Sequence, residues 1–156
     1  HGVGSETLQE IISTRKHGQP PQLDVELSAS ELTRLFDLAD RVHLPTAVAN
    51  YIARIVGNTN PGSAAAPEEI RKFVRYGASP RAAIALAATA RSAALLAGKP
   101  NVGFADVRRV ALSVLGHRII LDYAARLEGW TPARIVERLL ESVSEVSREL
   151  PEDLKE

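Results

Sequence analysis

Apolar side chains recur every three to four residues along most of the 156-residue chain, which is the spacing of one face of an α-helix. No stretch shows the regular alternation of a half-buried strand, although a brief extended piece fits residues 119–121. The expected fold class is therefore all-α, a small helical bundle with a preceding connecting helix. The predicted helices cover residues 5–16, 28–42, 45–56, 80–97, 106–115 and 131–143, with a short helical turn at 67–70.

Capping residues mark the ends of several predicted helices. The second helix opens on Ser28-Ala-Ser-Glu31, which has the S-x-x-E pattern of a capping box. Ser79 precedes Pro80, so that the serine suits the N-cap and the proline suits the first helical position. Gly98 follows the long alanine-rich helix at the position where a glycine closes many helices. The helix over residues 80–97 is therefore bounded at both ends.

The start of this long helix carries an unexpected charge. Arg81 lies in its first turn, where the positive end of the helix dipole opposes a cation. A cation kept at that position suggests contact with an anion, and a planar, permanently charged guanidinium suits phosphate. The alternative is an exposed arginine whose stem covers apolar surface. Gly77 is expected to give backbone freedom to the turn just upstream. The expected broad face of the helix consists of Ile84, Ala87, Ala88, Arg91, Ala94 and Leu95.

Composition and charge exclude several classes of function. Nineteen basic residues balance nineteen acidic ones, so no net field attracts nucleic acid or an anionic membrane, and we expect neither as a partner. No apolar run approaches the roughly 18 residues that a membrane span needs. The chain has no cysteine, which excludes disulfides and thiolate metal sites and is compatible with a reducing compartment. Because it begins at His1 and contains no methionine, we expect it to be a fragment of a longer protein.

Two motifs resemble one known family. Tyr76-Gly-Ala-Ser-Pro-Arg-Ala82 is similar to the sensor-2 motif in the C-terminal helical lid of MoxR-type AAA+ ATPases, and Gly116-His-Arg-Ile119 is similar to that family's Leu-x-His-Arg motif. The resemblance extends over residues 75–121 in motifs and over 28–143 in pattern. It implies a connecting helix and linker from a missing ATPase core at 1–27, a lid domain at 28–147 and a disordered tail at 148–156.

The resemblance also implies a function for the motif. Arg81 would be the sensor-2 arginine, which reaches from the lid to the γ-phosphate of a nucleotide bound on the core. Gly77, Ser79 and Pro80 would complete this nucleotide-binding segment. The parent protein would bind ATP and Mg²⁺ on its own AAA+ core, form a homo-hexamer and act as a chaperone-like remodelling ATPase in the cytoplasm. A protein with a von Willebrand factor A domain would be a further partner.

The chain itself carries no motif for ATP hydrolysis. It has neither a G-x-x-x-x-G-K-[ST] loop for phosphates nor a hydrophobic run ending in Asp-Glu for magnesium. We therefore expect this fragment to bind no cofactor or metal and to hydrolyse nothing by itself. The competing hypothesis is a stand-alone helical interaction module, in which the alanine-rich helix offers a groove to a partner helix.

Three other features have structural interpretations. His43 and Tyr51 are expected to be structural residues rather than ligands. His117 and Arg118 lie near a predicted helix C-terminus, where positive charge caps carbonyls, and the alternative is contact with the nucleotide of a neighbouring subunit. Residues 57–67 are rich in turn formers and predict a mobile surface loop, although contact with a nucleotide or partner is an alternative.

Overall fold

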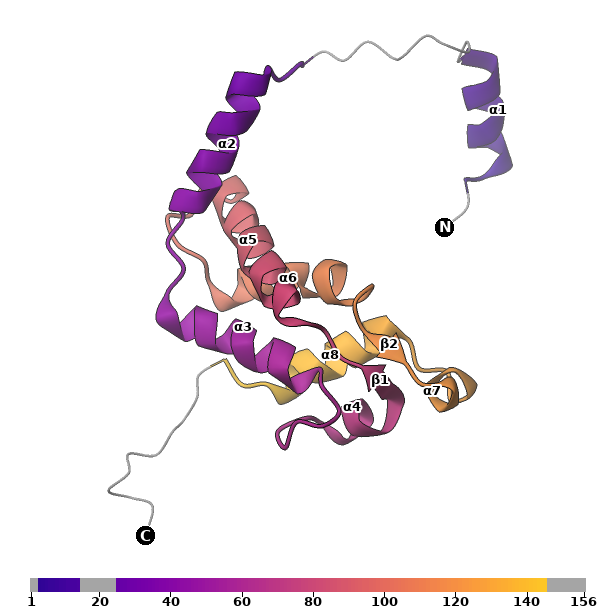
Figure 1. The fold of residues 1–156 in the computed structure, drawn as a ribbon. Coiled ribbons are helices and arrows are strands. Elements are labelled where there is room, and N and C mark those ends of the chain that lie inside the picture. Colours follow the sequence, from indigo (N-terminus) through magenta and orange to yellow (C-terminus); the bar gives the residue numbers. More distant parts are fainter. Residues whose placement is uncertain (1–2, 15–24, 146–156) are drawn as a thin grey trace. The chain divides into compact units, whose positions relative to one another are not determined.

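The computed structural model describes residues 3–14 and 25–145, and it is helical apart from one short pair of strands (Figure 1). The expected all-α class is confirmed. The chain divides into two compact units, residues 1–32 and 33–156. The expected tail at 148–156 and most of the expected linker lie outside the described residues. The elements are α1 (Ser5–Thr14), α2 (Ala29–Arg41), α3 (Thr46–Asn58), α4 (Glu68–Phe73), β1 (Val74–Tyr76), α5 (Pro80–Leu96), α6 (Phe104–Leu115), β2 (Ile120–Leu121), α7 (Tyr123–Leu127) and α8 (Pro132–Ser142).

The predicted capping box at the start of α2 is present. The hydroxyl of Ser28 donates to a carboxylate oxygen of Glu31 at 2.7 Å, and the Ser28 backbone N–H donates to the same oxygen at 2.8 Å. These two hydrogen bonds hold the pKa of Glu31 below its usual value. The apolar face of α2 is not buried, however, since Phe36 is 63% exposed and the helix contains no buried residue. The pattern therefore located the helix but not a partner for its face.

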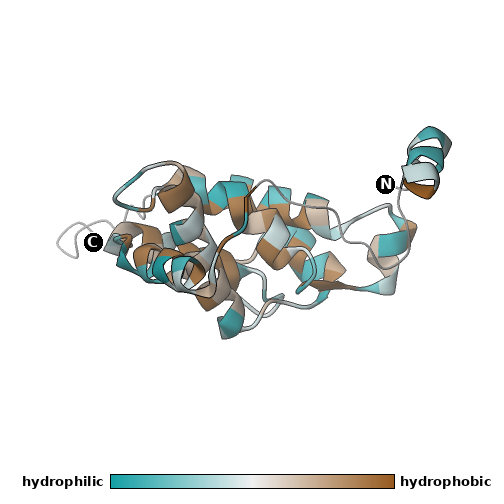
Figure 2. Cartoon of the chain, turned by 90° about the horizontal axis from the view of Figure 1, so that it is seen from above, coloured by the Kyte–Doolittle hydropathy of each residue, from teal (hydrophilic) through white to brown (hydrophobic). Residues whose placement is uncertain are grey.

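The hydrophobic core lies where α3, α5, α6 and α8 meet. Helix α5 packs against α6 and α3, and α6 and α3 also contact α8. Figure 2 shows hydrophobic and hydrophilic residues on the same helices, as expected for elements with one buried side. The largest fully buried side chains of these four helices are Tyr51, Ile55, Leu86, Leu115, Ile135 and Leu139. This core holds the N-terminal end of α5 in place.

The buried face of α5 differs from the predicted one. Ala82, Leu86, Ala90 and Ala94 are buried, whereas Ile84 is 71% exposed. Of the six residues expected on one face, only Ala94 is fully buried. The reason is that alanine occupies about half of the positions and is found on every side of this helix, so hydrophobic periodicity defines no single stripe. The packing of α5 against α3 and α6 selects the face instead.

Both strands are short, and sequence reasoning missed one of them. β1 pairs with β2 in antiparallel orientation, with Val74 opposite Leu121 and Tyr76 opposite Ile120. The extended piece expected at 119–121 is thus present as β2. The three residues of β1 are too few to show an alternating pattern, so the strand could not be distinguished from a loop. This pairing holds the chain immediately before the start of α5.

The C-terminal end of α5 is closed by the glycine that the sequence predicted. Gly98 has a φ of 67°, in the left-handed region. Its N–H donates to the Leu95 carbonyl at 2.9 Å, and the Lys99 N–H donates to the Ala94 carbonyl at 2.9 Å. These two bonds form a Schellman motif, which satisfies carbonyls that would otherwise lack a partner. Helix α5 therefore has a well-defined C-terminal end, before the loop that leads to α6.

Candidate functional site

The motif at residues 76–82 joins β1 to α5. Ser79 is the N-cap residue of α5, with extended backbone angles (φ −80°, ψ 168°), and Pro80 is in the first turn. Both positions agree with the prediction. The Ser79 side chain forms no capping hydrogen bond, however, so the expected role of its hydroxyl is wrong. The backbone supplies the first turn instead, because the Ala82 N–H donates to the Ser79 carbonyl at 2.8 Å.

Gly77 is required by close packing rather than by an unusual backbone angle. Its φ is not in the left-handed region, so the expectation that it supplies backbone freedom is not supported. A Cβ atom at this position would lie 2.5 Å from the carbonyl oxygen of Thr59 and 2.8 Å from the backbone nitrogen of Asn60. The chain before α5 therefore lies directly against the chain that ends α3.

Thr59 makes the second contact between these two segments. It follows α3 as the C-cap residue and is fully buried. Its hydroxyl donates to the Val56 carbonyl at 2.6 Å and accepts the N–H of Ala78 at 2.8 Å. Sequence reasoning missed this residue, because its partner Ala78 is 19 residues away and no local pattern records the contact. It lies in the segment 57–67, for which the sequence predicts a mobile surface loop. That prediction is wrong at the start of the segment, because α3 extends to Asn58 and Thr59 is buried.

Arg81 is exposed at the start of α5. Its guanidinium forms no hydrogen bond or ion pair with the residues 3–14 and 25–145 that the structure describes. The next residue, Ala82, is fully buried, which anchors the turn that carries the arginine. Arg81 is thus a cation without a partner among the described residues, and it stands on an anchored turn. This geometry is compatible with the predicted binding of an anion.

An apolar pocket adjoins the same segment. It has a volume of about 370 Å³ and is formed between the C-terminal half of α3 and the start of α5. Its lining residues are Ala53, Val56, Gly57, Asn60, Ala78, Pro80 and Ala83. Two of these residues, Ala78 and Pro80, belong to the motif itself. The site therefore combines an exposed cation, unpaired within the described part of the chain, with a neighbouring apolar surface.

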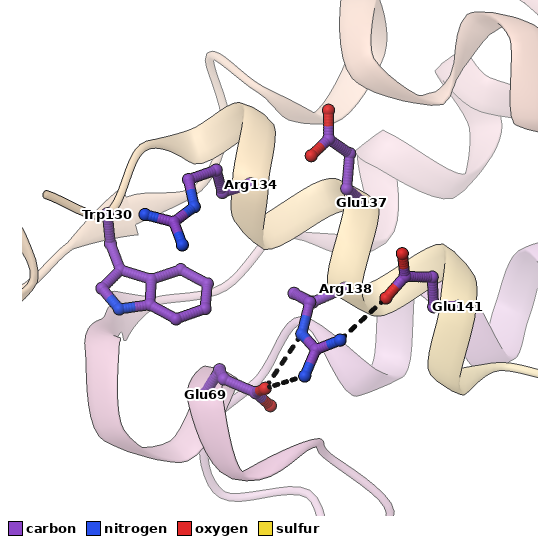
Figure 3. Close-up of a pocket in the computed structure, with 6 residues that line it drawn as sticks. All are labelled: Glu69, Trp130, Arg134, Glu137, Arg138 and Glu141. Carbon is purple, nitrogen blue, oxygen red and sulfur yellow. Dashed lines mark hydrogen bonds and ion pairs between the residues drawn. The ribbon is translucent and has the colours of Figure 1, made fainter.

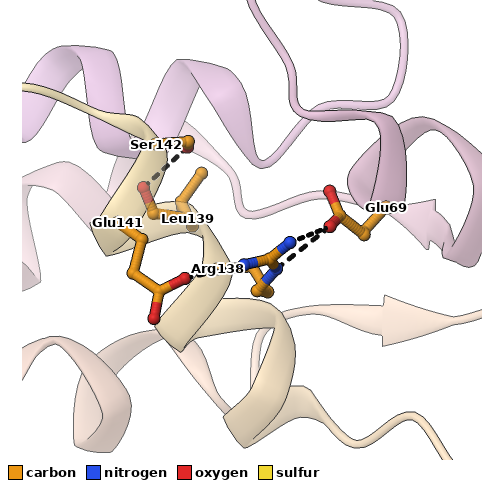
Figure 4. Close-up of polar contacts among 5 residues, drawn as sticks. All are labelled: Glu69, Arg138, Leu139, Glu141 and Ser142. Atoms are coloured by element: carbon orange, nitrogen blue, oxygen red, sulfur yellow. Dashed lines mark hydrogen bonds and ion pairs between the residues drawn. The ribbon is translucent and has the colours of Figure 1, made fainter.

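A second pocket, of about 330 Å³, is polar and lies between α4 and α8 (Figure 3). Its wall includes Arg138, which donates to Glu69 at 2.7 and 3.0 Å and to Glu141 at 2.9 Å. Figure 4 shows the same guanidinium between the two carboxylates, beside the hydrogen bond from Ser142 to the Leu139 carbonyl. The Arg138 charge is therefore already satisfied. This cluster links α4 to α8 and is a weaker candidate for an anion site than Arg81.

The pKa shifts of Glu69 and Arg138 agree with a structural role for this polar cluster. Hydrogen bonds from its own backbone N–H and from Arg138 hold the pKa of Glu69 below its usual value. Hydrogen bonds to Glu69 and, to a smaller extent, to Glu141 raise the pKa of Arg138. The neighbouring Arg134 lies over the ring of Trp130, 4.6 Å from its centroid, and Trp130 stacks on Phe73 at 4.9 Å. Glu69 and Arg138 therefore both favour their charged forms, and the ion pair between them links α4 to α8.

His43 and Tyr51 occupy structural positions. The backbone N–H of His43 donates to Pro100 and its carbonyl accepts from Val102, which ties the start of α3 to the loop before α6. Tyr51 is fully buried and packs edge-on against Phe104, with ring centroids 5.4 Å apart. Within the described part of the chain, no group of three His, Asp or Glu side chains could hold a metal ion. Tyr51 is thus a residue of the core, whereas His43 contributes its backbone, and that neither side chain binds a ligand stays a prediction.

Arg118 lies just after α6 and caps it. Its guanidinium donates to the Val114 carbonyl in the last turn of α6 and contacts the ring of His117. The expected capping of carbonyls is thus confirmed for Arg118. His117 is exposed. Contact of Arg118 with the nucleotide of a neighbouring subunit stays an untested alternative.

Three comparisons relate this chain to known proteins. Residues 68–139 match the AAA lid domain family. Over 143 residues the chain is 34% identical to Chaperone MoxR1 of Mycobacterium tuberculosis, a match that covers 92% of this chain and 38% of MoxR1. A crystal structure of a protein from Cytophaga hutchinsonii that is assigned as an ATPase superposes with a TM-score of 0.79 at 26% identity. That match covers 95% of this chain and 45% of the other.

The helical bundle that carries Arg81 is therefore an AAA lid domain. More particularly, it is a MoxR-like AAA+ lid, so the resemblance inferred from residues 76–82 is confirmed. The chain spans less than half the length of either relative. None of the helices in the described ranges is long and apolar enough to cross a membrane.

Proposed function

We propose that this lid serves an AAA+ core that binds and hydrolyses ATP, and that Arg81 contacts the γ-phosphate as the sensor-2 arginine. In this role the guanidinium detects the presence of the terminal phosphate and couples its loss to a rotation of the lid. The free energy of such a contact is substantial, because a hydrogen bond to a charged group contributes about 1.5–3 kcal/mol. The alternative of a stand-alone interaction module is not favoured by the match to the AAA lid family.

The observation that carries the proposal is the state of Arg81 itself. The side chain is exposed, lacks a partner among the described residues, and stands in the first turn of a helix anchored by the buried Ala82. A cation in this position gains nothing from the helix dipole. An oligophosphate placed between the guanidinium and the N-terminal end of α5 would interact favourably with both.

Within the part of the chain that the structure describes, the residues fit one end of the nucleotide and not its metal. Arg81 supplies a guanidinium, and the apolar pocket beside Pro80 offers a surface for an uncharged part of the ligand. Carboxylate clusters suited to Mg²⁺ do not occur among the described residues. The metal and most phosphate contacts must therefore come from the AAA+ core, which is the expected partner of the lid.

The broader function follows from the relative rather than from the geometry. MoxR1 bears the name of a chaperone. We accordingly propose that the parent of this chain is a chaperone-like remodelling ATPase of the cytoplasm that assembles into a homo-hexamer. A von Willebrand factor A domain protein is a proposed partner.

The test is the ATPase activity of the full-length protein with Arg81→Ala. If Arg81 stabilises the transferring phosphate, kcat should fall by about 10- to 100-fold, as expected for one lost charge-assisted hydrogen bond. Arg81→Lys retains the charge but loses the planar fork, and should recover only part of the rate.

Arg71→Ala is the matched control, since Arg71 is an exposed lid arginine whose guanidinium also lacks a partner in the described ranges. It should leave the rate unchanged. An Arg81→Ala protein with the wild-type kcat would remove Arg81 from the mechanism.

A further inference from the structure

A buried threonine links the end of α3 to the segment that carries Arg81. Thr59 has no exposed surface, and its hydroxyl both donates to Val56 and accepts from Ala78. Buried hydroxyl groups are nearly always satisfied in this way. The bond to Ala78 is different from the first, because it connects two segments that only the fold brings together.

Gly77 and Ala78, two consecutive residues of the motif, both contact Thr59. The backbone of Gly77 lies against its carbonyl group, so closely that a Cβ would be 2.5 Å from the oxygen. The N–H of Ala78 is bound by its hydroxyl at 2.8 Å. The carbonyl contact prevents the segment from moving closer to α3, and the hydroxyl bond prevents it from moving away.

The backbone between Ala78 and Arg81 has little conformational freedom, so fixing Ala78 also fixes the start of α5. Ser79 has extended backbone angles, Pro80 has a ring-fixed φ, and the Ala82 N–H closes the first turn onto the Ser79 carbonyl at 2.8 Å. The Ser79 side chain does not cap the helix. The position at which α5 begins therefore depends on Thr59 rather than on the serine of the motif.

We propose that Thr59 is a positioning residue for Arg81, and that its hydroxyl sets the place from which the guanidinium reaches the nucleotide. Thr59 itself touches no ligand. The inference rests on the proposed role of Arg81. A small shift in where α5 begins would be enough to lower the rate, because displacements of about 1 Å at a reacting centre cost up to about 100-fold in rate.

The experiment measures steady-state ATP hydrolysis by the full-length protein with substitutions at position 59. Thr59→Val preserves the shape and removes the hydroxyl, so kcat should fall by about three- to tenfold, as expected for one lost neutral hydrogen bond. Thr59→Ser retains the hydroxyl and should stay within about twofold of the wild-type rate. Thr59→Ala, which removes the hydroxyl without placing a methyl beside the Ala78 N–H, should reproduce the loss if the valine variant does not fold.

A matched control separates positioning from general loss of stability. Thr89 is half-buried and its hydroxyl also forms a hydrogen bond, but this bond, to the Ala85 carbonyl at 2.7 Å, lies within α5. Thr89→Val should therefore leave kcat unchanged. All rates are compared below the unfolding midpoint of each variant.

The double variant gives the decisive readout. If Thr59 acts through Arg81, then Thr59→Val should cause no further loss of kcat in the Arg81→Ala protein, whereas independent structural effects would multiply. A wild-type rate for Thr59→Val and Thr59→Ala, or multiplicative losses in the double variant, would overturn the positioning role while leaving Arg81 in place. A wild-type rate for Arg81→Ala alone would instead refute the proposed function.

Discussion

Gly77→Ala tests the close contact between the end of α3 and the start of α5. The added Cβ would lie 2.5 Å from the Thr59 carbonyl oxygen and 2.7 Å from its carbonyl carbon, whereas ordinary contacts begin at 3.4 Å. The backbone must therefore separate by about 1 Å, and no flexible side chain can move instead, because the obstructing atoms are main-chain atoms. Forcing extra volume into a packed site costs about 1–3 kcal/mol.

Two further effects modify this cost. Alanine restricts the unfolded chain more than glycine does, which offsets up to about 1 kcal/mol. The separation of the two segments also lengthens the 2.8 Å bond between the Ala78 N–H and the Thr59 hydroxyl, which adds to the loss. We expect a net decrease of about 1–2 kcal/mol in the free energy of unfolding.

Urea unfolding followed by tryptophan fluorescence measures this change. The single tryptophan, Trp130, stacks on the buried Phe73 at 4.9 Å and so reports on the packed state. Gly57→Ala is the matched control, because Gly57 lies in α3 and a Cβ there would meet nothing within 4 Å. That variant should be more stable than wild type by about 0.5–1 kcal/mol. A Gly77→Ala protein as stable as the wild type would show that the two segments are not in contact.

Three other substitutions test the packing of α5 and the start of α6. Leu86→Ala empties a fully buried position and should lower the free energy of unfolding by about 2–5 kcal/mol in the same urea assay. Ile84→Ala, at a position 71% exposed, should change it by less than about 0.5 kcal/mol. The reverse order would show that the face expected from the sequence is the buried one. Burial tends to raise the pKa of Asp106, but hydrogen bonds from Lys99 at 2.8 Å and from the Gly103 N–H at 2.9 Å outweigh it, so that the pKa lies below the ordinary value of 3.8. A lowered pKa means that the carboxylate stabilises the fold fully above the ordinary value and loses this contribution as the pH falls through the folded-state pKa. Asp106→Asn should therefore be less stable than wild type by about 1–3 kcal/mol at pH 7, with a gap that closes in strongly acidic solution, and a gap independent of pH would contradict the assignment.

Local signals in the sequence were sufficient for most helices and their ends. The capping box at Ser28 and Glu31, the proline at position 80 and the glycine at position 98 all act between residues that are close in the chain. For the same reason the motif at 76–82 could be recognised, and with it the AAA lid family. The face of α5 could not be predicted, because a helix rich in alanine is nearly equally apolar on every side.

The sequence by itself determined most of the helices, the capping box of α2, the glycine that ends α5, the motif and the position of Arg81 at the start of α5. Only the tertiary structure decided which side of that helix is buried, why residue 77 is a glycine, and that Thr59 binds Ala78 across 19 residues of chain. The physical reason is the range of the interactions. Caps and turns join neighbours in sequence, whereas close packing and buried hydrogen bonds depend on which segments the fold brings together.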